Sequence, residues 1–221
     1  MDYKELANLV GPRVGATQEW VYHVLRKGII DGILPGGMQL KQDEISAALN
    51  VSHIPVRESL RQLEAQGLVR IQPNRGASVT QLSREMVIDM MEIRAYISAN
   101  ILKTAIPLMT EDDFAQVAEL IDRERNERDL FVVEQINYDF HDLLLKKAGN
   151  VVADLIMEII HANIDRYLRS SFYSSDETRQ ISIDEHEAIL AACKARDVDT
   201  ASRLLSDHIL DAVKYLPSTL Q

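Results

Sequence analysis

The sequence predicts a mainly α-helical protein made of two unlike units. The first, residues 17–82, shows helical spacing of apolar side chains and then two short β-type runs. The second, residues 83–221, shows no strand pattern, and between residues 83 and 216 it holds one glycine, Gly149, and one proline, Pro107. Because these two residue types break helices, their scarcity favours long helices with short loops. We therefore expect a small unit with a β-hairpin, followed by an all-α bundle of six to seven helices.

Charge divides the chain at the same point. The 221 residues hold 24 Lys and Arg against 34 Asp and Glu, a net charge of -10. Residues 17–82 carry seven basic and six acidic side chains, a net charge of +1, whereas residues 83–221 carry 15 basic and 26 acidic ones. Phosphate binding requires Lys and Arg only where a protein touches the duplex. The acidic excess therefore argues against a nucleic-acid partner for the second unit but not for the first.

Composition excludes several broad classes of protein. With 46% hydrophobic and 26% charged residues, the chain can build a core. Its single cysteine, Cys193, rules out a disulfide framework within one chain and fits a reducing cytoplasm. No apolar run approaches the roughly 20 residues of a membrane span, and the first residues lack the apolar core of a signal peptide. We expect a cytoplasmic protein without a membrane partner.

In the first unit, we expect helices over residues 17–31, 42–49 and 52–66. The turn cluster at residues 32–37 ends the first helix, and Ser52 is a suitable N-cap for the third, which ends before Gly67. Strands are expected over 68–71 and 77–80, joined by a hairpin loop at 73–76. Residues 1–16 form an N-terminal extension to this unit, residues 17–82.

The second unit, residues 83–221, is expected to consist of long helices. Ser83 and Thr110 are plausible N-caps, and Asp113 follows Thr110 at the spacing of a capping box. Gly149 marks a junction between two helices. The expected helices cover residues 83–105, 110–128, 130–148, 150–171, 176–195 and 197–215.

The order helix, turn, helix and hairpin is that of a winged helix-turn-helix, in which the second helix of the pair enters the major groove of DNA. Arginine can bond guanine bidentately, and Ser or His can bond phosphates or base edges. A glycine at the hairpin tip allows close approach to a phosphate. The candidate DNA-binding residues are Ser52, His53, Arg57 and Arg61 on the helix and Arg75 and Gly76 at the tip. The same pattern also fits a small helical domain with a charged face.

The identity of individual residues in the first unit favours DNA binding. The run from Gly32 to Val79, and above all Pro55-Val56-Arg57-Glu58-Ser59-Leu60, resembles the DNA-binding domain of the GntR family of bacterial regulators. The resemblance implies that Arg57, Arg75 and Gly76 contact DNA, and that His53 occupies the position of a recognition residue. Three positions depart from the family pattern, because Asp43 and His53 stand where the family often has arginine, and Ile54 where it often has threonine.

Three histidines of the second unit share the apolar stripes of three different helices. His141 lies four residues after Asn137, His186 shares a stripe with Ile183 and Ile189, and His208 shares one with neighbouring leucines. All three are therefore expected to point inward. Convergent imidazoles suit a divalent transition metal, but inward histidines can also be hydrogen-bonded core residues, and the spacing leaves both interpretations open.

The acidic helical bundle that follows the GntR-type DNA-binding domain resembles the FadR-type C-terminal domain called FCD. The resemblance of the two domains together covers about residues 17–216. Metal-binding members of that family carry Asp-x3-His on one helix and two later histidines. The resemblance implies that Asn137, His141, His186 and His208 bind a divalent metal of the zinc, nickel or manganese class. Asn137 replaces the usual aspartate with a neutral and weaker donor, so metal affinity or preference should change.

In that family the metal helps to hold a small organic acid, whose carboxylate needs a cation nearby. Arg94 lies on the inward flank of the first bundle helix, and a buried arginine is costly unless an anion accompanies it. Asn163 and Arg166 lie on or near the inward face of the fourth helix. We expect these three residues to bind the effector; an internal salt bridge or polar network is the alternative. Ser98 stands where the family often has glutamate.

Together these observations predict a ligand-responsive bacterial regulator, more often a repressor than an activator. It would bind a pseudo-palindromic operator as a homodimer and respond to a small carboxylate near a divalent metal. The alternative is a metal-dependent helical enzyme with an appended DNA-binding-like domain. No catalytic residue is assigned, because Cys193 lacks an activating base and no Ser-His-Asp arrangement or glycine-rich phosphate loop is apparent. A purely structural acidic bundle would leave the first unit unexplained.

Overall fold

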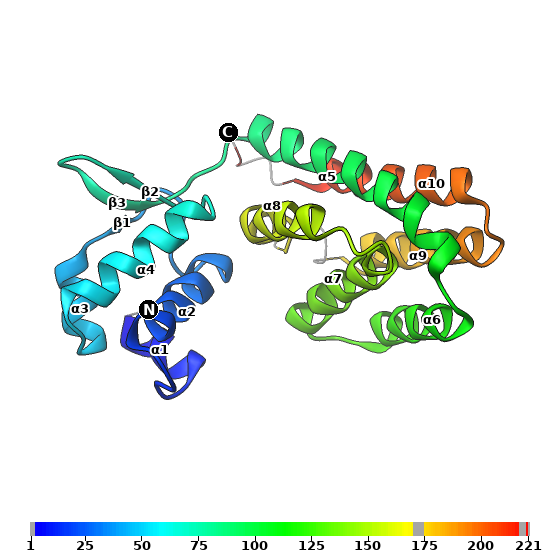
Figure 1. The fold of residues 1–221 in the computed structure, drawn as a ribbon. Coiled ribbons are helices and arrows are strands. Elements are labelled where there is room, and N and C mark those ends of the chain that lie inside the picture. Colours follow the sequence, from blue (N-terminus) through cyan, green and yellow to red (C-terminus); the bar gives the residue numbers. More distant parts are fainter. Residues whose placement is uncertain (1–2, 170–174, 217–219, 221) are drawn as a thin grey trace. The chain divides into compact units, whose positions relative to one another are not determined.

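The computed structural model describes residues 3–169, 175–216 and 220 (Figure 1). The chain divides into two compact units. The first runs to Leu82 and takes in His161–Arg166, a short part of the helix α8 (Val151–Arg169), and the second begins at Ser83. No helix in the described ranges is long and apolar enough to cross a membrane.

The first unit is a winged helix-turn-helix with an additional N-terminal helix. Its helices are α1 (Tyr3–Val10), α2 (Thr17–Ile30), α3 (Gln42–Leu49) and α4 (His53–Ala65). A three-stranded antiparallel sheet, in the order β1-β3-β2, consists of β1 (Gln39–Leu40), β2 (Val69–Gln72) and β3 (Gly76–Val79). The strand β1 pairs Gln39 with Ser78 and Leu40 with Ala77, so it joins the wing to the segment that leads into α3.

The helix-turn-helix follows from local sequence. Asn50 ends α3 in the left-handed conformation, with φ 52°, which asparagine tolerates better than most residues. Val56, Leu60 and Leu63 of α4 are fully buried against the core of this unit. Ser52 occupies the N-cap position of α4, but its hydroxyl makes no capping hydrogen bond, contrary to the role expected of it. The helix α4 is therefore held mainly by its buried stripe.

The helix α1 packs on α2 and α3 and belongs to the same core. Leu6 is fully buried and Tyr3 is 8% exposed. A glycine on α2 permits this close packing, because a β-carbon at Gly28 would lie 2.8 Å from Leu6 Cδ1 and 2.9 Å from Leu34 Cδ1, so that these side chains would have to shift. The residues before Thr17 thus include an ordered helix, to which the sequence pattern alone assigned no structure.

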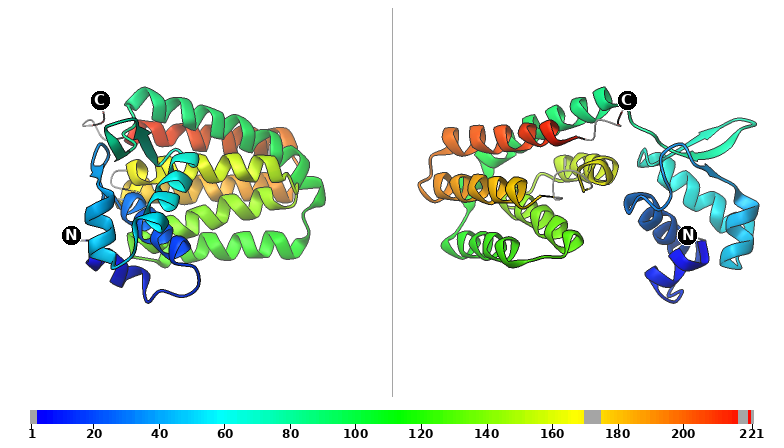
Figure 2. Two further views of the ribbon diagram at one scale, coloured as in Figure 1. Left: turned by 60° about the vertical axis from the view of Figure 1, so that its left-hand side comes forward. Right: turned by 180° about the vertical axis from the view of Figure 1, so that it is seen from behind.

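The second unit is an all-α bundle, seen from two further sides in Figure 2. Its helices are α5 (Arg84–Ala105), α6 (Glu111–Asn126), α7 (Leu130–Lys146), α8 (Val151–Arg169), α9 (Asp176–Lys194) and α10 (Val198–Asp211). Short 3-10 turns follow α5, at Ile106–Leu108, and α10, at Ala212–Tyr215. Around the bundle, α5 contacts α10, α10 contacts α9, α9 contacts α6, α6 contacts α7, and α7 contacts α5. These contacts close a ring of helices with a common interior.

Side chains at the helix ends explain where several of these helices begin. Ser83 accepts a hydrogen bond from the backbone N–H of Met86. Thr110 and Asp113 form the expected capping box, and Lys147 Nζ lies 3.1 Å from Asp113 Oδ2. Each cap satisfies backbone donors that the first helical turn leaves unpaired.

Candidate functional site

The first candidate surface is the exposed side of α4 and the wing tip. The side chains of His53, Arg57 and Arg61 are 62%, 53% and 64% exposed. The Nε of Arg57 and the Nη1 of Arg61 lie 3.6 and 3.7 Å from the same Glu58 carboxylate oxygen. Two arginines one turn apart on an exposed helix face can reach base edges or phosphates.

Two further features of this surface concern the positions that depart from the family pattern. His53 Nδ1 lies 3.5 Å from Asp43 Oδ1, and the Asp43 side chain is 92% exposed. Ile54, in the first turn of α4, is 64% exposed. The surface thus combines an imidazole–carboxylate pair, an apolar side chain and the cationic Arg57.

The wing tip lies between β2 and β3. Arg75 and Gly76 are exposed, and Asn74 and Gly76 adopt positive φ values of 61° and 79°. The Arg75 backbone N–H donates to the carbonyl of Gln72 at 3.1 Å, which closes the turn. The tip therefore presents one cation on a tight turn.

The second candidate site is a histidine cluster in the interior of the bundle, defined as His141 on α7, His186 on α9 and His208 on α10. Their exposed fractions are 3%, 0% and 7%. Each offers a ring nitrogen, and these three atoms all lie within 4.8 Å of one another. Nε2 of His186 is 3.1 Å from Nε2 of His208. The structure thus brings together the three inward histidines that the sequence pattern singled out.

Two carboxylates face the other ring nitrogens of His186 and His208. Nδ1 of His186 lies 2.9 Å from Oε2 of Glu124 on α6, a side chain that is itself buried. Nδ1 of His208 lies 2.7 Å from Oε2 of Glu185. A carboxylate beside Nδ1 favours a proton on that nitrogen and leaves the Nε2 lone pair as an acceptor.

Packing fixes the orientation of the rings. Phe140 stacks on His186 with ring centroids 3.8 Å apart. Arg179 of α9 donates through Nη2 to the carbonyls of Glu124 and Arg125, at 2.9 and 3.0 Å, and so ties the end of α6 to α9. The histidine cluster is held by neighbouring helices rather than by a loop.

With both Nδ1 atoms facing carboxylates, the Nε2 lone pairs of His186 and His208 face each other. Two acceptors 3.1 Å apart repel unless a proton or a cation lies between them. Neutral imidazole nitrogens on rigid helices, with carboxylates on their far nitrogens, are the usual ligands of zinc and related ions. The donor set of the histidine cluster therefore fits a divalent transition metal.

A buried cation lies close to the histidine cluster. Burial lowers the pKa of His208 to about 4, and the hydrogen bond to Glu185 only partly opposes this, while the charges of His186 and Arg94 lower the pKa further. Arg94, on α5, is itself 5% exposed. Arg94 therefore places a buried positive charge close to His208, whose Nδ1 faces the carboxylate of Glu185.

Several buried oxygens near these residues have unused hydrogen-bonding capacity. Among the described residues, Ser98 Oγ, Ser182 Oγ and Glu124 Oε1 have no hydrogen-bond partner. Ser98 lies one turn after Arg94, and Ser182 one turn before His186. Because buried polar atoms are nearly always hydrogen-bonded, these three oxygen atoms favour a polar ligand in the bundle interior.

The remaining predicted site residues are placed as follows. Asn137 lies one turn before His141 on α7 and is half-buried, so its role as a ligand stays a prediction. Asn163 falls within His161–Arg166, the part of α8 that groups with the first unit. The backbone of Arg166 lies in α8, but its side chain is outside the described part of the structure.

Glu124 and Glu185 were not predicted as site residues from the sequence. Glu124 continues the buried stripe of Val117, Leu120 and Ile121 on α6, so its position on an apolar face was a usable signal. Glu185 carries no such signal, because it follows another acid and contacts His208 across helices rather than its neighbour His186. Such a contact depends on how α9 and α10 pack.

Cys193 lies in the same helix as His186 and is fully buried. Burial raises the pKa of its thiol to about 12, so the reactive thiolate is scarce at neutral pH. This agrees with its interpretation as a small core residue.

Two family models match the chain, in the order that the fold suggests. The first, bacterial regulatory proteins of the gntR family, matches residues 17–79. The second, the FCD domain, matches residues 89–211, which is more than half of the chain. The matches cover the helix-turn-helix with its wing and the ring of helices around the histidine cluster.

Individual proteins and solved structures are similar to this chain along most of its length. The HTH-type transcriptional repressor RspR of Escherichia coli (strain K12) is 28% identical over 196 residues, 87% of this chain and 86% of that protein. A solved GntR family regulator from Pseudomonas syringae pv. tomato str. DC3000 is 30% identical, with a TM-score of 0.54, and the alignment covers 96% of this chain and 91% of that one. The structure of E. coli McbR/YncC, 19% identical, has the same fold, with a TM-score of 0.73 over 91% of this chain and 97% of that one.

The folds of both units, the two family models and the relatives all indicate the same family. The chain is therefore a transcriptional regulator, not an enzyme, and belongs to the GntR family of bacterial regulatory proteins, with a C-terminal FCD domain.

Proposed function

We propose that the chain is a homodimeric, metal-dependent repressor that binds a pseudo-palindromic operator and responds to a small carboxylate. In this proposal residues 17–82, preceded by the extension 1–16, read DNA. Residues 83–221 bind the effector and form the dimer. The observation that carries the proposal is the histidine cluster, three buried imidazoles with two carboxylates behind them, inside a domain that follows a DNA-binding unit.

The DNA-binding surface is proposed to consist of the exposed start of α4 and the wing tip. Arg57 would read a base edge, and Ser52, His53 and Arg61 would contact bases or phosphates around it. Arg75 and Gly76 would approach the backbone from the wing. A dimer would place two such readers on half-sites about one helical turn apart.

The metal would be held by His141, His186 and His208, with Asn137 as a fourth and weaker donor. When bound, the metal would supply a Lewis-acidic centre for a carboxylate oxygen. Glu124 and Glu185 keep protons on the far nitrogens of His186 and His208, so that their Nε2 lone pairs stay available.

The effector is proposed to be a small organic anion. Arg94 supports this proposal, because it is buried and its charge reaches His208. Ser98 and Ser182 would donate hydrogen bonds to such a ligand. Asn163 and Arg166, both on α8, stay predicted members of this set, although they fall in the part of α8 that groups with the first unit. An anion that binds one arrangement of the dimer better than the other would shift operator affinity by its differential affinity for the two arrangements.

A titration of DNA binding tests the proposal. An operator duplex would be selected from random sequence with the full chain, and its binding followed by fluorescence anisotropy in four conditions, with and without metal and with and without a carboxylate chosen by thermal-shift screening. We expect the carboxylate to change operator affinity only when Zn²⁺, Ni²⁺ or Mn²⁺ is present. An equal response in chelator-treated protein would contradict metal dependence.

A further inference from the structure

The loop between α1 and α2, residues 11–16, lies next to the start of the recognition helix and carries a cation, Arg13. This loop precedes residue 17, where the match to the GntR family model begins. It is nevertheless tied to the DNA-binding unit at its N-terminal end. The indole N–H of Trp20 donates to the carbonyl of Gly11 at 3.1 Å, and Leu6 of α1 is buried in the core of the unit.

A surface hollow shows which parts of the unit lie beside Arg13. Arg13 is exposed, and it lines the hollow with the start of α2, the turn of the helix-turn-helix and the first residues of α4. The other lining residues are Thr17, Gln18, Asn50, Val51, Ser52, Ile54, Pro55 and Glu58. The segment outside the family match thus adds a guanidinium to the side of the unit from which α4 begins.

The charges around Arg13 leave its guanidinium available to an outside anion. Glu58 is the carboxylate among the lining residues, and its Oε1 lies near both Arg57 and Arg61, at 3.6 and 3.7 Å. Within the described ranges no ion pair joins Arg13 to an acidic side chain. Ser52 lines the same hollow, and its hydroxyl does not cap α4. A cation and a hydroxyl beside the first turn of a recognition helix are groups that bind backbone phosphates.

We propose that Arg13 contacts a DNA phosphate, next to the base pairs that α4 reads, and that α1 serves to position it. This inference rests on the proposed use of α4 for DNA binding. A phosphate contact adds affinity without sequence preference, because every nucleotide offers the same phosphate. It would also partly offset the weak positive charge of the reader, a net +1 over residues 17–82.

Salt dependence distinguishes a phosphate contact from a structural role. Binding of the full-length chain would be measured by anisotropy over a KCl series, on the selected duplex and on a scrambled one, for the wild type, Arg13→Ala and Arg13→Lys. We expect Arg13→Ala to flatten the slope of log K against log salt by about 0.9 for each phosphate that the variant no longer neutralises, and to weaken binding about fivefold at 0.1 M salt. The loss should be similar on both duplexes, and Arg13→Lys should keep most of the wild-type slope.

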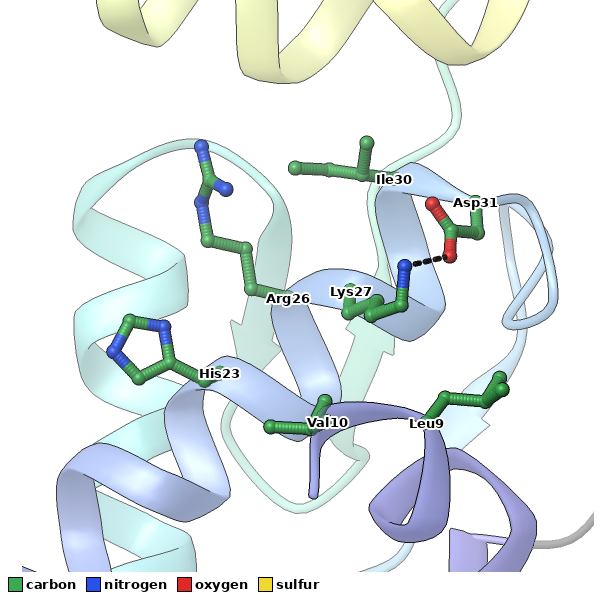
Figure 3. Close-up of a pocket in the computed structure, with 7 residues that line it drawn as sticks. All are labelled: Leu9, Val10, His23, Arg26, Lys27, Ile30 and Asp31. Atoms are coloured by element: carbon green, nitrogen blue, oxygen red, sulfur yellow. Dashed lines mark ion pairs between the residues drawn. The ribbon is translucent and has the colours of Figure 1, made fainter. Parts of the chain in front are cut away.

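Arg26→Ala is the matched control, because it makes the same charge change in the same unit. Arg26 lies about 12 Å along α2 from Gln18. It lines a different hollow with Leu9, Val10 and Lys27, the last of which pairs with Asp31 at 2.7 Å (Figure 3). The control should retain the wild-type slope and affinity.

Three results would overturn the proposal. An unchanged slope and affinity in Arg13→Ala, a loss confined to the selected duplex, or a loss matched by Arg26→Ala would each do so; thermal melting would verify that the variants are folded. Arg57→Ala separates this failure from that of the proposed function. If Arg57→Ala loses specific binding while Arg13→Ala does not change the slope, only the Arg13 contact is wrong. If Arg57→Ala also binds like the wild type, the use of α4 is wrong as well.

Discussion

His186 and His208 lie on successive helices, and their Nε2 atoms are 3.1 Å apart, while a carboxylate stands behind each ring. With a proton on each Nδ1, the lone pairs of the two Nε2 atoms point toward each other in the interior of the second unit. A metal ion between them would accept both lone pairs.

Replacing both histidines should remove bound metal. The protein, loaded with Zn²⁺, Ni²⁺ or Mn²⁺ and then desalted, should retain the ion, and the double variant His186→Ala with His208→Ala should not, because two of the three imidazole donors are gone. Elemental analysis measures the content, and the metal-induced rise in Tm should vanish with it. His23→Ala, which removes an exposed histidine of α2, is the control. Unchanged metal content in the double variant would refute the site.

Glu124→Gln should weaken metal binding without removing a ligand. The amide keeps a hydrogen-bond acceptor for His186 Nδ1 but loses the charge that raises the basicity of the ring, so we expect a roughly tenfold loss of affinity. Chelator competition gives the affinity. Asp122→Asn, an exposed acid two residues earlier on α6, is the matched change. Equal affinities for wild type and Glu124→Gln would show that Glu124 does not tune the histidine.

Arg57→Ala should abolish specific operator binding and leave the protein folded. Its side chain is 53% exposed, so its loss removes little packing, whereas a bidentate contact to a base contributes about 1–3 kcal/mol of discrimination. Anisotropy with the selected duplex, together with thermal unfolding, measures both effects. Arg203→Ala on α10 makes the same charge change in the second unit. Retained specific binding would contradict the assignment of α4 as the recognition helix.

Arg94→Gln should weaken the response to the effector and preserve DNA binding in its absence. The change removes the buried cation near His208 but keeps a polar side chain of similar length. The carboxylate concentration for half-maximal response should rise at least tenfold, and Arg94→Lys should show a smaller effect. Lys103→Ala, exposed on the same helix, is the control. A dose response identical to the wild type would remove Arg94 from the effector site.

The sequence was sufficient to predict the direction of a side chain where a single helix determines it. His141, His186 and His208 each share a stripe with apolar neighbours, so their inward direction follows from helical periodicity alone. The same holds for the capping box of Thr110 and Asp113, which depends on spacing within one turn.

The sequence was insufficient where a position depends on contacts between elements. The pairing of Glu185 with His208 depends on the packing of α9 against α10, which no local pattern encodes. The strand β1 has two residues, too few for an alternating pattern, and is defined by its pairing with β3. Ser52 has the identity and position of an N-cap, yet its hydroxyl does not cap the helix.

The close approach at Gly28 links two positions that are distant in the sequence. Leu6 and Leu34 occupy the space where a β-carbon at residue 28 would lie, and both are buried. With alanine at this position, the ends of the Leu6 and Leu34 side chains would have to move aside. The absence of a side chain on α2 is thus what lets α1 and the turn after α2 meet over the same backbone position.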